Sequence, residues 1–412
     1  MAPEVIMSVN KKSIVIIGAG HAGLTLAREI RANCKATEIT IISREAIRSY
    51  YKPSLSKALS MNKAPGQLVM KQAETIAEEL NVKLLGQMTV IDIDAERKEI
   101  KGLFNDSEES SVMTVQYQSL VLATGASPVK LPIERELCTP LLSINNLEDY
   151  EAFRASIEQK KKILIIGAGF VGCELASDLI SSDYEVDIVD LLEWPLQRTM
   201  PEVMGTEIKN AMMDQGVEWH LGATLISVAT TEQGVKTGCL SDGTTVQIDE
   251  IVSAVGLVPN VGLAREAGVT VQRGIEVDEY SKTNQPDIYA LGDCVEYQGV
   301  TLPFIAPATH AAKALAKTLT GTKTALVLPA LPVTVKINAC PTVLCPSLHK
   351  KGIWQLQGSG LDLEARFINE AGELSGFALT GQCLSKKNQL ASECLPTISL
   401  AAEINESHEA VA

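Results

Sequence analysis

The sequence predicts an α/β protein with two parallel-sheet units, followed by a smaller α+β unit. Two observations predict the sheets: a run of β-prone apolar residues enters a Gly-x-Gly-x-x-Gly turn at residues 14–23, and the pattern returns at 163–172. The third is a change of pattern after residue 326, where short alternating segments such as 332–337 and 374–379 predict strands of a separate domain. At 412 residues the chain has room for two or three domains.

The first glycine motif predicts a turn that binds a dinucleotide. Gly18 permits the tight turn, Gly20 lets the backbone approach a diphosphate, and Gly23 lets the following helix pack closely on the strand. Residues 24–30 have apolar side chains near a 3.6-residue period, which is typical of a helix. The free amide groups at the start of that helix favour a bound diphosphate.

The second glycine motif turns a weak signal into a strong one. Gly167, Gly169 and Gly172 repeat the spacing, so we expect two Rossmann-like domains that bind two dinucleotides, and a flavin with a nicotinamide is the chemically useful pair. Asp190 lies 18 residues past Gly172, where an acid binds the ribose 2′-hydroxyl of NAD and repels a 2′-phosphate. This favours NADH, although Arg198 offers a cation for the phosphate of NADPH.

The corresponding acid of the first unit has two candidate positions. Glu45 lies 22 residues past Gly23 and is a candidate ligand for the ribose, whereas Ser43 ends the predicted strand more directly.

Lys52 stands in a segment stiffened by Pro53, where it either places a cation near a flavin or is solvated at the surface. Both alternatives stay open at this stage.

Four later segments complete the predicted site. The buried strands at 120–126 and 251–256 both end in small residues, which let the backbone lie against a flat cofactor. Asp293 follows a short strand and is either a ligand of a ribityl hydroxyl or a helix cap. A helix starting near Pro307 directs its positive end at a reduced, anionic flavin.

The composition excludes several classes of protein. A formal net charge of −14 with no basic arm argues against nucleic acid and against the anionic face of a membrane, and no apolar stretch is long enough for a membrane span. The N-terminus has no signal-peptide pattern, and nine scattered cysteines are typical of reduced cytoplasmic thiols. We predict no metal site, and the oligomeric state is open, with a monomer possible.

The cysteine positions also bear on the chemistry. No cysteine lies between Cys34 and Cys138, so we expect no dithiol relay beside the flavin. Cys340 and Cys345 have the spacing of a redox disulfide but lack a neighbouring nucleotide turn, and we interpret them as structural thiols. We place the FAD-binding domain at 1–118 and 248–325, the NADH-binding domain at 119–247, and the C-terminal domain, with a frayed tail, at 326–412.

Taken in order, the motifs carry a family resemblance. The motifs resemble the FAD-dependent pyridine nucleotide-disulfide oxidoreductase superfamily: the two glycine turns, Tyr-x-Lys-Pro-x-Leu-Ser at 50–56, Ala-Thr-Gly-Ala at 123–126, Ala-Val-Gly-Leu-Val-Pro-Asn at 254–260 and Ile-Tyr-Ala-Leu-Gly-Asp-Cys at 288–294. Because the chain lacks the active-site dithiol, it is similar to the ferredoxin- and rubredoxin-reductase branch of this superfamily. The segments at 332–336, 340–341 and 48–53 resemble most the bacterial NADH:rubredoxin reductases. The resemblance implies a glutathione-reductase-like three-layer architecture.

The resemblance also assigns roles to matching positions. Residues implied to contact FAD are Gly18, Gly20, His21, Ala22, Gly23, Glu45, Lys52, Pro53, Val90, Ala123, Thr124, Gly125, Asp293, Ile305 and Lys336. Residues implied to form the NADH groove are Gly167, Gly169, Phe170, Val171, Gly172, Glu174, Asp190 and Gly256. A Lys52–Glu174 pair beside the flavin is expected to tune and shield it, and these two residues are the candidates for a catalytic role.

The implied function is electron transfer from NADH through FAD to rubredoxin, which supplies an alkane hydroxylase. The nearest alternative is reduction of a ferredoxin in an oxygenase or P450 chain. An NADH oxidase is less favoured because it needs a reactive thiol beside the flavin. The intact second glycine turn with Asp190 argues against a flavoprotein that serves only as a redox-sensing or binding module.

Overall fold

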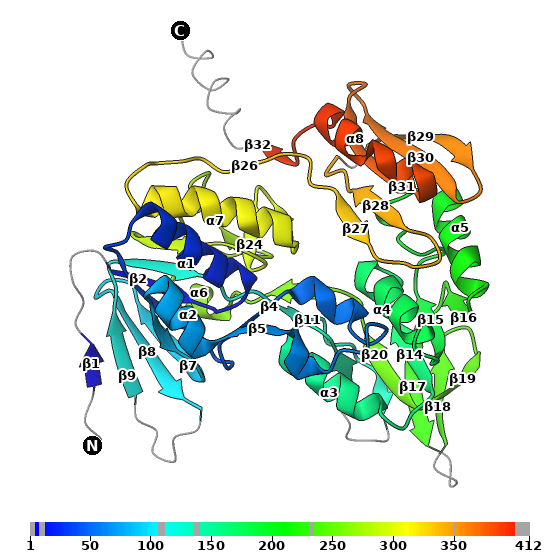
Figure 1. The fold of residues 1–412 in the computed structure, drawn as a ribbon, viewed down its shortest axis with the longest axis horizontal. Coiled ribbons are helices and arrows are strands. Elements are labelled where there is room, and N and C mark those ends of the chain that lie inside the picture. Colours follow the sequence, from blue (N-terminus) through cyan, green and yellow to red (C-terminus); the bar gives the residue numbers. More distant parts are fainter. Residues whose placement is uncertain are drawn as a thin grey trace.

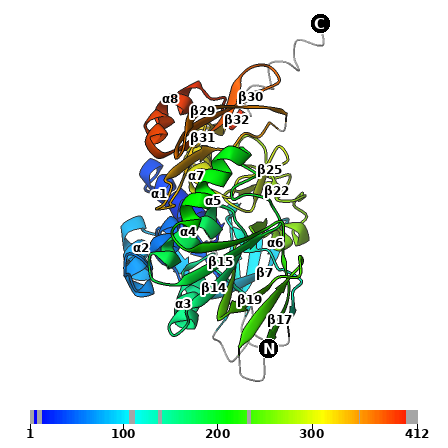
Figure 2. The same cartoon turned by 90° about the vertical axis from the view of Figure 1, so that its right-hand side faces the viewer.

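The computed structural model describes residues 5–7, 13–105, 112–135, 141–230, 235–349 and 351–399. Within them the chain forms two parallel five-stranded sheets, each covered by helices, and a separate C-terminal antiparallel sheet (Figures 1 and 2). This confirms the predicted fold class. The predicted loop at 105–111 and the polar tail at 403–412 lie almost wholly outside the described residues.

The first sheet has the strand order β23-β10-β2-β3-β6, and all its described pairings are parallel. Its strands are β2 (Ser13–Ile17), β3 (Glu38–Ile42), β6 (Lys83–Leu85), β10 (Ser119–Leu122) and β23 (Ile288–Ala290). All five residues of β2 are buried, which is why its sequence is continuously apolar rather than alternating. Helices α1 (His21–Asn33) and α7 (Ile305–Leu319) pack side by side on this sheet (Figure 1).

Smaller elements lie between and around the strands of the first sheet along the chain, and the two 3₁₀ helices among them pack on the second unit rather than on this sheet. These smaller elements are β1 (Val5–Met7), β4 (Arg48–Tyr50), η1 (Lys52–Lys57), η2 (Pro65–Leu68), β5 (Val69–Gln72), α2 (Ala73–Leu80), β7 (Met88–Asp94), β8 (Glu99–Phe104), β9 (Val112–Gln116), α6 (Gly262–Glu266), β22 (Ile275–Glu276), β24 (Val295–Tyr297) and β25 (Val300–Thr301). Strands β1, β9, β8 and β7 form a sheet of their own.

The second sheet repeats the plan of the first, with the order β13-β20-β14-β15-β16 and parallel pairing throughout. Its elements are β13 (Leu142–Ser143), α3 (Leu147–Ile157), β14 (Lys162–Ile166), α4 (Phe170–Ile180), β15 (Glu185–Asp190), α5 (Glu202–Met213), β16 (Val217–Leu221) and β20 (Glu250–Ser253). A four-stranded sheet of β12 (Glu134–Arg135), β17 (Leu225–Thr230), β18 (Lys236–Leu240) and β19 (Thr245–Ile248) adjoins it. The predicted turn at Asp242–Gly243 connects β18 to β19.

Two predicted domain boundaries are wrong by one strand each. The boundary at 118/119 separates β10 from β2, yet these strands pair, with Leu120 opposite Val15. The boundary at 247/248 removes β20 from the second sheet, yet β20 pairs with β14. The chain therefore crosses between units after β10 and after β20. The two-stranded ribbon of β11 (Ala126–Pro128) and β21 (Leu257–Pro259) carries both crossings.

The C-terminal sheet is antiparallel in the order β27-β28-β31-β30-β29. Its elements, with the flanking ones, are β26 (Val327–Leu328), β27 (Val333–Val335), β28 (Thr342–Cys345), β29 (Gly352–Ser359), β30 (Asp362–Asn369), β31 (Leu374–Thr380), η3 (Gly381–Lys386), α8 (Lys387–Glu393) and β32 (Ile398–Ser399). Its buried residues share one apolar core with α4 and α5, so this domain packs on the second unit (Figure 2).

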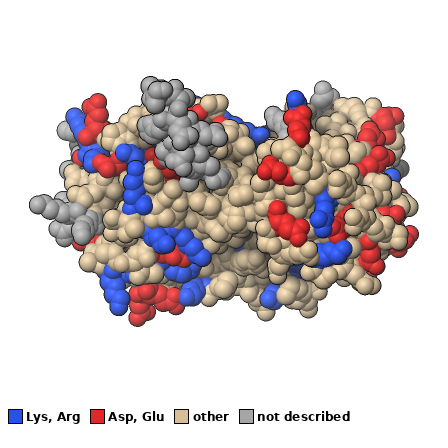
Figure 3. Space-filling model, turned by 90° about the horizontal axis from the view of Figure 1, so that it is seen from above, with Lys and Arg blue, Asp and Glu red and all other residues tan. Residues whose placement is uncertain are grey.

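Surface charge is unevenly spread over the molecule. Seen from above, acidic side chains prevail on the half that holds the C-terminal domain, whereas the other half shows basic and acidic groups together (Figure 3). Among the described helices, none combines the length and the apolar character that crossing a bilayer requires.

Candidate functional site

A cavity of about 740 Å³ lies at the carboxyl ends of the strands of the first sheet. It is bounded by the first glycine turn, η1, the start of α3 and the start of α7. Most of the residues expected to contact FAD line it: Gly18, Gly20, His21, Ala22, Glu45, Lys52, Val90, Ala123, Thr124, Gly125, Asp293 and Ile305. Crevices of this kind at the carboxyl edge of a doubly wound sheet are where such folds bind ligands.

The glycines of the first turn have the surroundings that their predicted roles require. Gly18 has a positive φ of 119°, and a Cβ there would lie 2.0 Å from the Ala123 carbonyl oxygen. A Cβ on Gly23 would lie 2.0 Å from the Gly18 carbonyl oxygen, so this glycine does not line the cavity but lets α1 pack on the turn. A Cβ on Gly20 would meet nothing within 4 Å and would occupy the space next to the turn.

Several features of the cavity fit a flavin dinucleotide. Helix α1 begins after Gly20 with no side-chain cap, so its first amide groups are available to a diphosphate. The Asp293 carboxylate has one described charged partner, Lys52, whose Nζ is 4.0 Å away, and no described hydrogen bond, so it can accept one from a sugar-alcohol hydroxyl. Burial raises the pKa of Asp293, and nearby Lys52 partly opposes this.

His21, the first residue of α1, is partly buried in the same wall. Its Nε2 lies 2.9 Å from Oγ1 of Thr309 on α7, a contact that joins the two helices. Burial lowers the pKa of His21, and the neighbouring Arg28 lowers it further. The imidazole is therefore neutral near pH 7, and it adds no fixed charge to the cavity.

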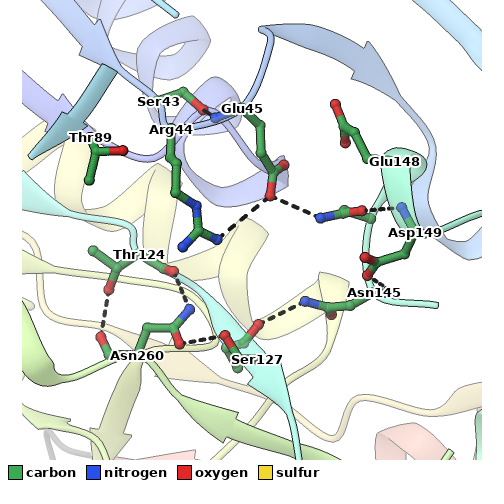
Figure 4. Close-up of polar contacts among 12 residues, drawn as sticks. Ser43, Arg44, Glu45, Thr89, Thr124, Ser127, Asn145, Glu148, Asp149 and Asn260 are labelled. Carbon is green, nitrogen blue, oxygen red and sulfur yellow. Dashed lines mark hydrogen bonds and ion pairs between the residues drawn. The ribbon is translucent and has the colours of Figure 1, made fainter. Parts of the chain in front are cut away.

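Glu45 faces the loop that enters α3, as Figure 4 shows. Its Oε1 accepts a hydrogen bond of 2.9 Å from Nδ2 of Asn146 and lies 4.0 Å from Nη2 of Arg44. Burial raises the pKa of Glu45, as does the neighbouring Glu148. Ser43 accepts the amide hydrogen of Glu45 through its Oγ and also lines the cavity, so both candidates for the ribose contact stand at this end of it.

The opposite wall is held by a network that sequence reasoning did not single out. Asn260, directly after β21, donates through Nδ2 to the Thr124 carbonyl at 2.9 Å and accepts from Oγ of Ser127 at 2.7 Å (Figure 4). The Thr124 hydroxyl donates to the Asn260 carbonyl at 2.8 Å. These bonds fix the Thr124–Gly125 backbone that faces the cavity. The Pro259–Asn260 pair that ends the buried strand was the sequence signal.

The expected pair of Lys52 with Glu174 is wrong. Nζ of Lys52 donates to Oδ1 of Asn145 at 2.8 Å. Glu174 instead accepts hydrogen bonds from the Ser56 hydroxyl and from the Lys336 backbone, and its Oε2 lies 2.9 Å from Nζ of Lys336. Glu174 lies in the second turn of α4 and is 8% exposed; its side chain reaches η1 and the residue directly after β27, and it does not line the cavity.

Two further expected FAD contacts belong to this second cluster. Nζ of Lys336 donates to the Pro53 carbonyl and to Oγ of Ser56, and neither Lys336 nor Pro53 lines the cavity. The cluster connects three segments: η1, α4 of the second unit and the residue directly after β27 of the C-terminal domain. Its position indicates an anchor between domains.

The second glycine turn repeats the geometry of the first. A Cβ on Gly172 would lie 1.9 Å from the Gly167 carbonyl oxygen, whereas one on Gly169 or Gly256 would meet nothing within 4 Å. Val171 is 47% exposed, which leaves a surface for a ligand beside the turn. Helix α4, like α1, starts with no side-chain cap. The same local sequence thus builds a second turn of the same geometry.

Asp190 ends β15 next to this turn. Its Oδ2 accepts the amide hydrogen of Ala168 at 2.6 Å, and its Oδ1 accepts that of Leu192 at 2.8 Å. A carboxylate oxygen has more than one lone pair, so these bonds leave capacity for a ribose hydroxyl. The ribose contact stays a prediction.

A pair of aromatic rings connects the second glycine turn to the cavity of the first unit. Phe170, the first residue of α4, packs edge-on against Phe304, directly before α7, with ring centroids 5.9 Å apart. Phe304 lines the cavity of the first unit. The first residue of α4 therefore contacts a residue that lines the first cavity. Hydride transfer between two bound dinucleotides would require such proximity.

Cysteines take no part in the described cavity walls. The Cys294 thiol, next to Asp293, lies 3.4 Å from the Leu291 carbonyl oxygen, and burial raises its pKa. Cys340 and Cys345 are free and buried, and burial raises the pKa of Cys340 to about 11, as a structural thiol requires. A reactive thiolate therefore does not arise from these residues.

The chain is similar to known proteins over most of its length. The family model described as pyridine nucleotide-disulphide oxidoreductase matches residues 12–316, and one described as rubredoxin binding C-terminal domain matches residues 325–394. The chain is similar to the Rubredoxin-NAD(+) reductase of Alcanivorax borkumensis, at 38% identity over 93% of this chain and 99% of that protein. It is also similar to the nitric oxide reductase FlRd-NAD(+) reductase of Aeromonas hydrophila, at 36% identity over 91% of this chain and 94% of that protein. A solved ferredoxin reductase from Rhodopseudomonas palustris superposes with a TM-score of 0.83 at 25% identity, over 98% of this chain and all of that one.

Proposed function

Since the chain belongs to the pyridine nucleotide-disulphide oxidoreductase family, an FAD-dependent family that uses nicotinamide nucleotides, we propose that it passes electrons from NADH to rubredoxin. The observation that carries the choice of rubredoxin is the match of residues 325–394 to the rubredoxin binding C-terminal domain. The name of the relative from Alcanivorax borkumensis supports the same acceptor.

The first cavity is the proposed FAD site. Bound FAD would supply the conversion of a two-electron hydride donor into single electrons for an iron protein. The chain's own residues bind and orient: the free amide groups of α1 and the bare backbone at Gly20 hold the diphosphate, and Asp293 accepts from a ribityl hydroxyl. The Lys52 ammonium and the amino-terminal end of α7 supply positive charge to the cavity.

The second turn is the proposed NADH site. The first amide groups of α4 bind the diphosphate, and Asp190 is the proposed partner of the adenosine ribose. The contact of Phe170 with Phe304, which lines the first cavity, supports transfer between the two proposed sites. Hydride transfer needs no side-chain acid there, so the contribution of the protein is proximity and orientation.

Supply of an alkane hydroxylase is the finer part of this proposal, and it follows from the resemblance to NADH:rubredoxin reductases. Two alternatives have specific support. The relative from Aeromonas hydrophila, by its name, serves a nitric oxide reductase, and the superposed structure is a ferredoxin reductase. The eight described free cysteines fit action in a reducing compartment, and we propose the cytoplasm.

Acceptor preference is the direct test of this proposal. The flavin-loaded protein is mixed with NADH and, in parallel, with rubredoxin, a plant-type ferredoxin or an adrenodoxin-type ferredoxin, and bleaching of each carrier is followed. We expect rubredoxin to be reduced fastest. Faster reduction of either ferredoxin would move the protein to an oxygenase chain, and oxygen consumption without reduction of any carrier would make it an oxidase.

A further inference from the structure

Lys52 has an unusual partner for a cation that faces a cavity. Its Nζ donates to the neutral Oδ1 of Asn145 at 2.8 Å, whereas its carboxylate partner, Oδ2 of Asp293, lies 4.0 Å away. All three side chains line the cavity. Asn145 comes from the loop between β13 and α3, whereas Lys52 begins η1, so the bond joins segments that are 93 residues apart in the chain.

The orientation of the Asn145 amide is fixed by its other contacts. Its Nδ2 donates to the Ala126 carbonyl at 2.8 Å, and its backbone amide donates to Oδ2 of Asp149 at 2.9 Å (Figure 4 shows Asn145 beside Asp149). Because Nδ2 must face a carbonyl, Oδ1 must face the ammonium of Lys52. Asp149 is in turn held by Asn146, which accepts its amide hydrogen at the start of α3.

We propose that Asn145 is a positioning residue that holds the Lys52 ammonium over the cavity and apart from Asp293. The inference rests on the proposed function, in which this cavity binds FAD. A neutral amide accepts the hydrogen bond and leaves the positive charge of the ammonium in place, whereas a carboxylate would offset that charge. The held charge favours the uptake of electrons by a bound flavin. Without Asn145, the flexible lysine side chain is free to close on Asp293 or to turn to solvent.

The test is a cycle of variants read by the midpoint potential of the bound FAD, titrated with a chemical reductant and a reference dye. We expect Asn145→Leu to shift the potential to more negative values, in the same direction as Lys52→Met. In a Lys52→Met background, Asn145→Leu is expected to add no further shift, because the charge that it positions is gone.

A matched control exists on the same 3₁₀ helix. Lys57 donates to Oδ1 of Asn338 at 2.8 Å, the same bond at the surface and away from the cavity. Asn338→Leu is expected to leave the potential unchanged. If Asn145→Leu does not fold, Asn145→Asp retains the acceptor oxygen and adds a negative charge, and a negative shift is again expected.

Three results would overturn the proposal: no shift in Asn145→Leu, the same shift in the Lys52→Met background, or an equal shift in Asn338→Leu. The titration needs only bound flavin and no protein acceptor. A failure to reduce rubredoxin would therefore refute the proposed function while this cycle still supports or overturns the role of Asn145.

Discussion

Gly20 and Gly23 lie three residues apart in one turn, yet the structure predicts different consequences when each gains a methyl group. The Cβ of Gly23→Ala would lie 2.0 Å from the Gly18 carbonyl oxygen, closer than the 3.0 Å limit that real Cβ contacts observe. The Cβ of Gly20→Ala would meet nothing within 4 Å, and the extended backbone there (φ −70°, ψ −172°) accepts alanine. We therefore expect Gly23→Ala to destabilise the fold and Gly20→Ala to weaken binding of the ligand.

The magnitudes follow from these contacts. Gly23→Ala must move α1 off the turn by about 1 Å, and overpacking of this kind costs about 3 kcal/mol at the upper end of its usual range. Helix propensity returns about 1 kcal/mol, so we expect the free energy of unfolding to fall by about 2 kcal/mol. Gly20→Ala loses the close approach to the diphosphate, and one charged hydrogen bond lost is about 1.5–3 kcal/mol, or roughly tenfold to a hundredfold in FAD affinity.

Two measurements separate the effects: denaturant unfolding of the flavin-free protein, and titration of that protein with FAD. Gly20→Ala is expected to unfold like the unaltered chain but to bind FAD weakly. Gly169→Ala, the equivalent change in the second turn, is the control and is expected to retain FAD while NADH binding weakens. Normal FAD affinity in Gly20→Ala, or destabilisation equal to that of Gly23→Ala, would refute the reasoning.

Three further predictions concern other parts of the site. Asp190→Ala is expected to raise the KM for NADH about tenfold without loss of bound FAD, as the loss of one to two hydrogen bonds implies, and a colourless variant would place Asp190 elsewhere. A double-mutant cycle on unfolding is expected to give a coupling of about 1 kcal/mol or more between Glu174 and Lys336 and none between Glu174 and Lys52, and the reverse would restore the pair expected from the sequence. Because burial lowers the pKa of His21 in the folded state, its contribution to stability is complete above pH 6.5 and is lost as the pH falls through the folded pKa; denaturant unfolding against pH should therefore show a weaker acid-side decline in His21→Gln.

The sequence predicted best what local rules determine. Both glycine turns, the strands that enter them and the helices that follow depend on residues adjacent in the chain, and the structure has them where the motifs placed them. The helix expected near Pro307 begins at Ile305. The family match confirms the resemblance inferred from the motifs.

What sequence reasoning missed depends on contacts between distant segments. Lys52 was given Glu174 as a partner because both were expected beside the flavin, yet Glu174 accepts from Lys336, 162 residues further along the chain. Asn145 was not singled out because a lone asparagine in a loop has no spacing signal. Asn260 was noted only as the end of a motif, because its bonds to Thr124 and Ser127 join segments that are far apart in the chain. The domain boundaries were wrong because β10 and β20 are short apolar strands whose sheet is decided by pairing.

The central claim is that this chain moves electrons from NADH to rubredoxin through bound FAD. The most direct measurement is stopped-flow reduction of purified rubredoxin by the flavin-loaded protein and NADH, with flavin and rubredoxin absorbance followed together. We expect the flavin to bleach first and rubredoxin to bleach next, at two molecules per NADH. Flavin that bleaches with NADH but is not reoxidised by rubredoxin would contradict it.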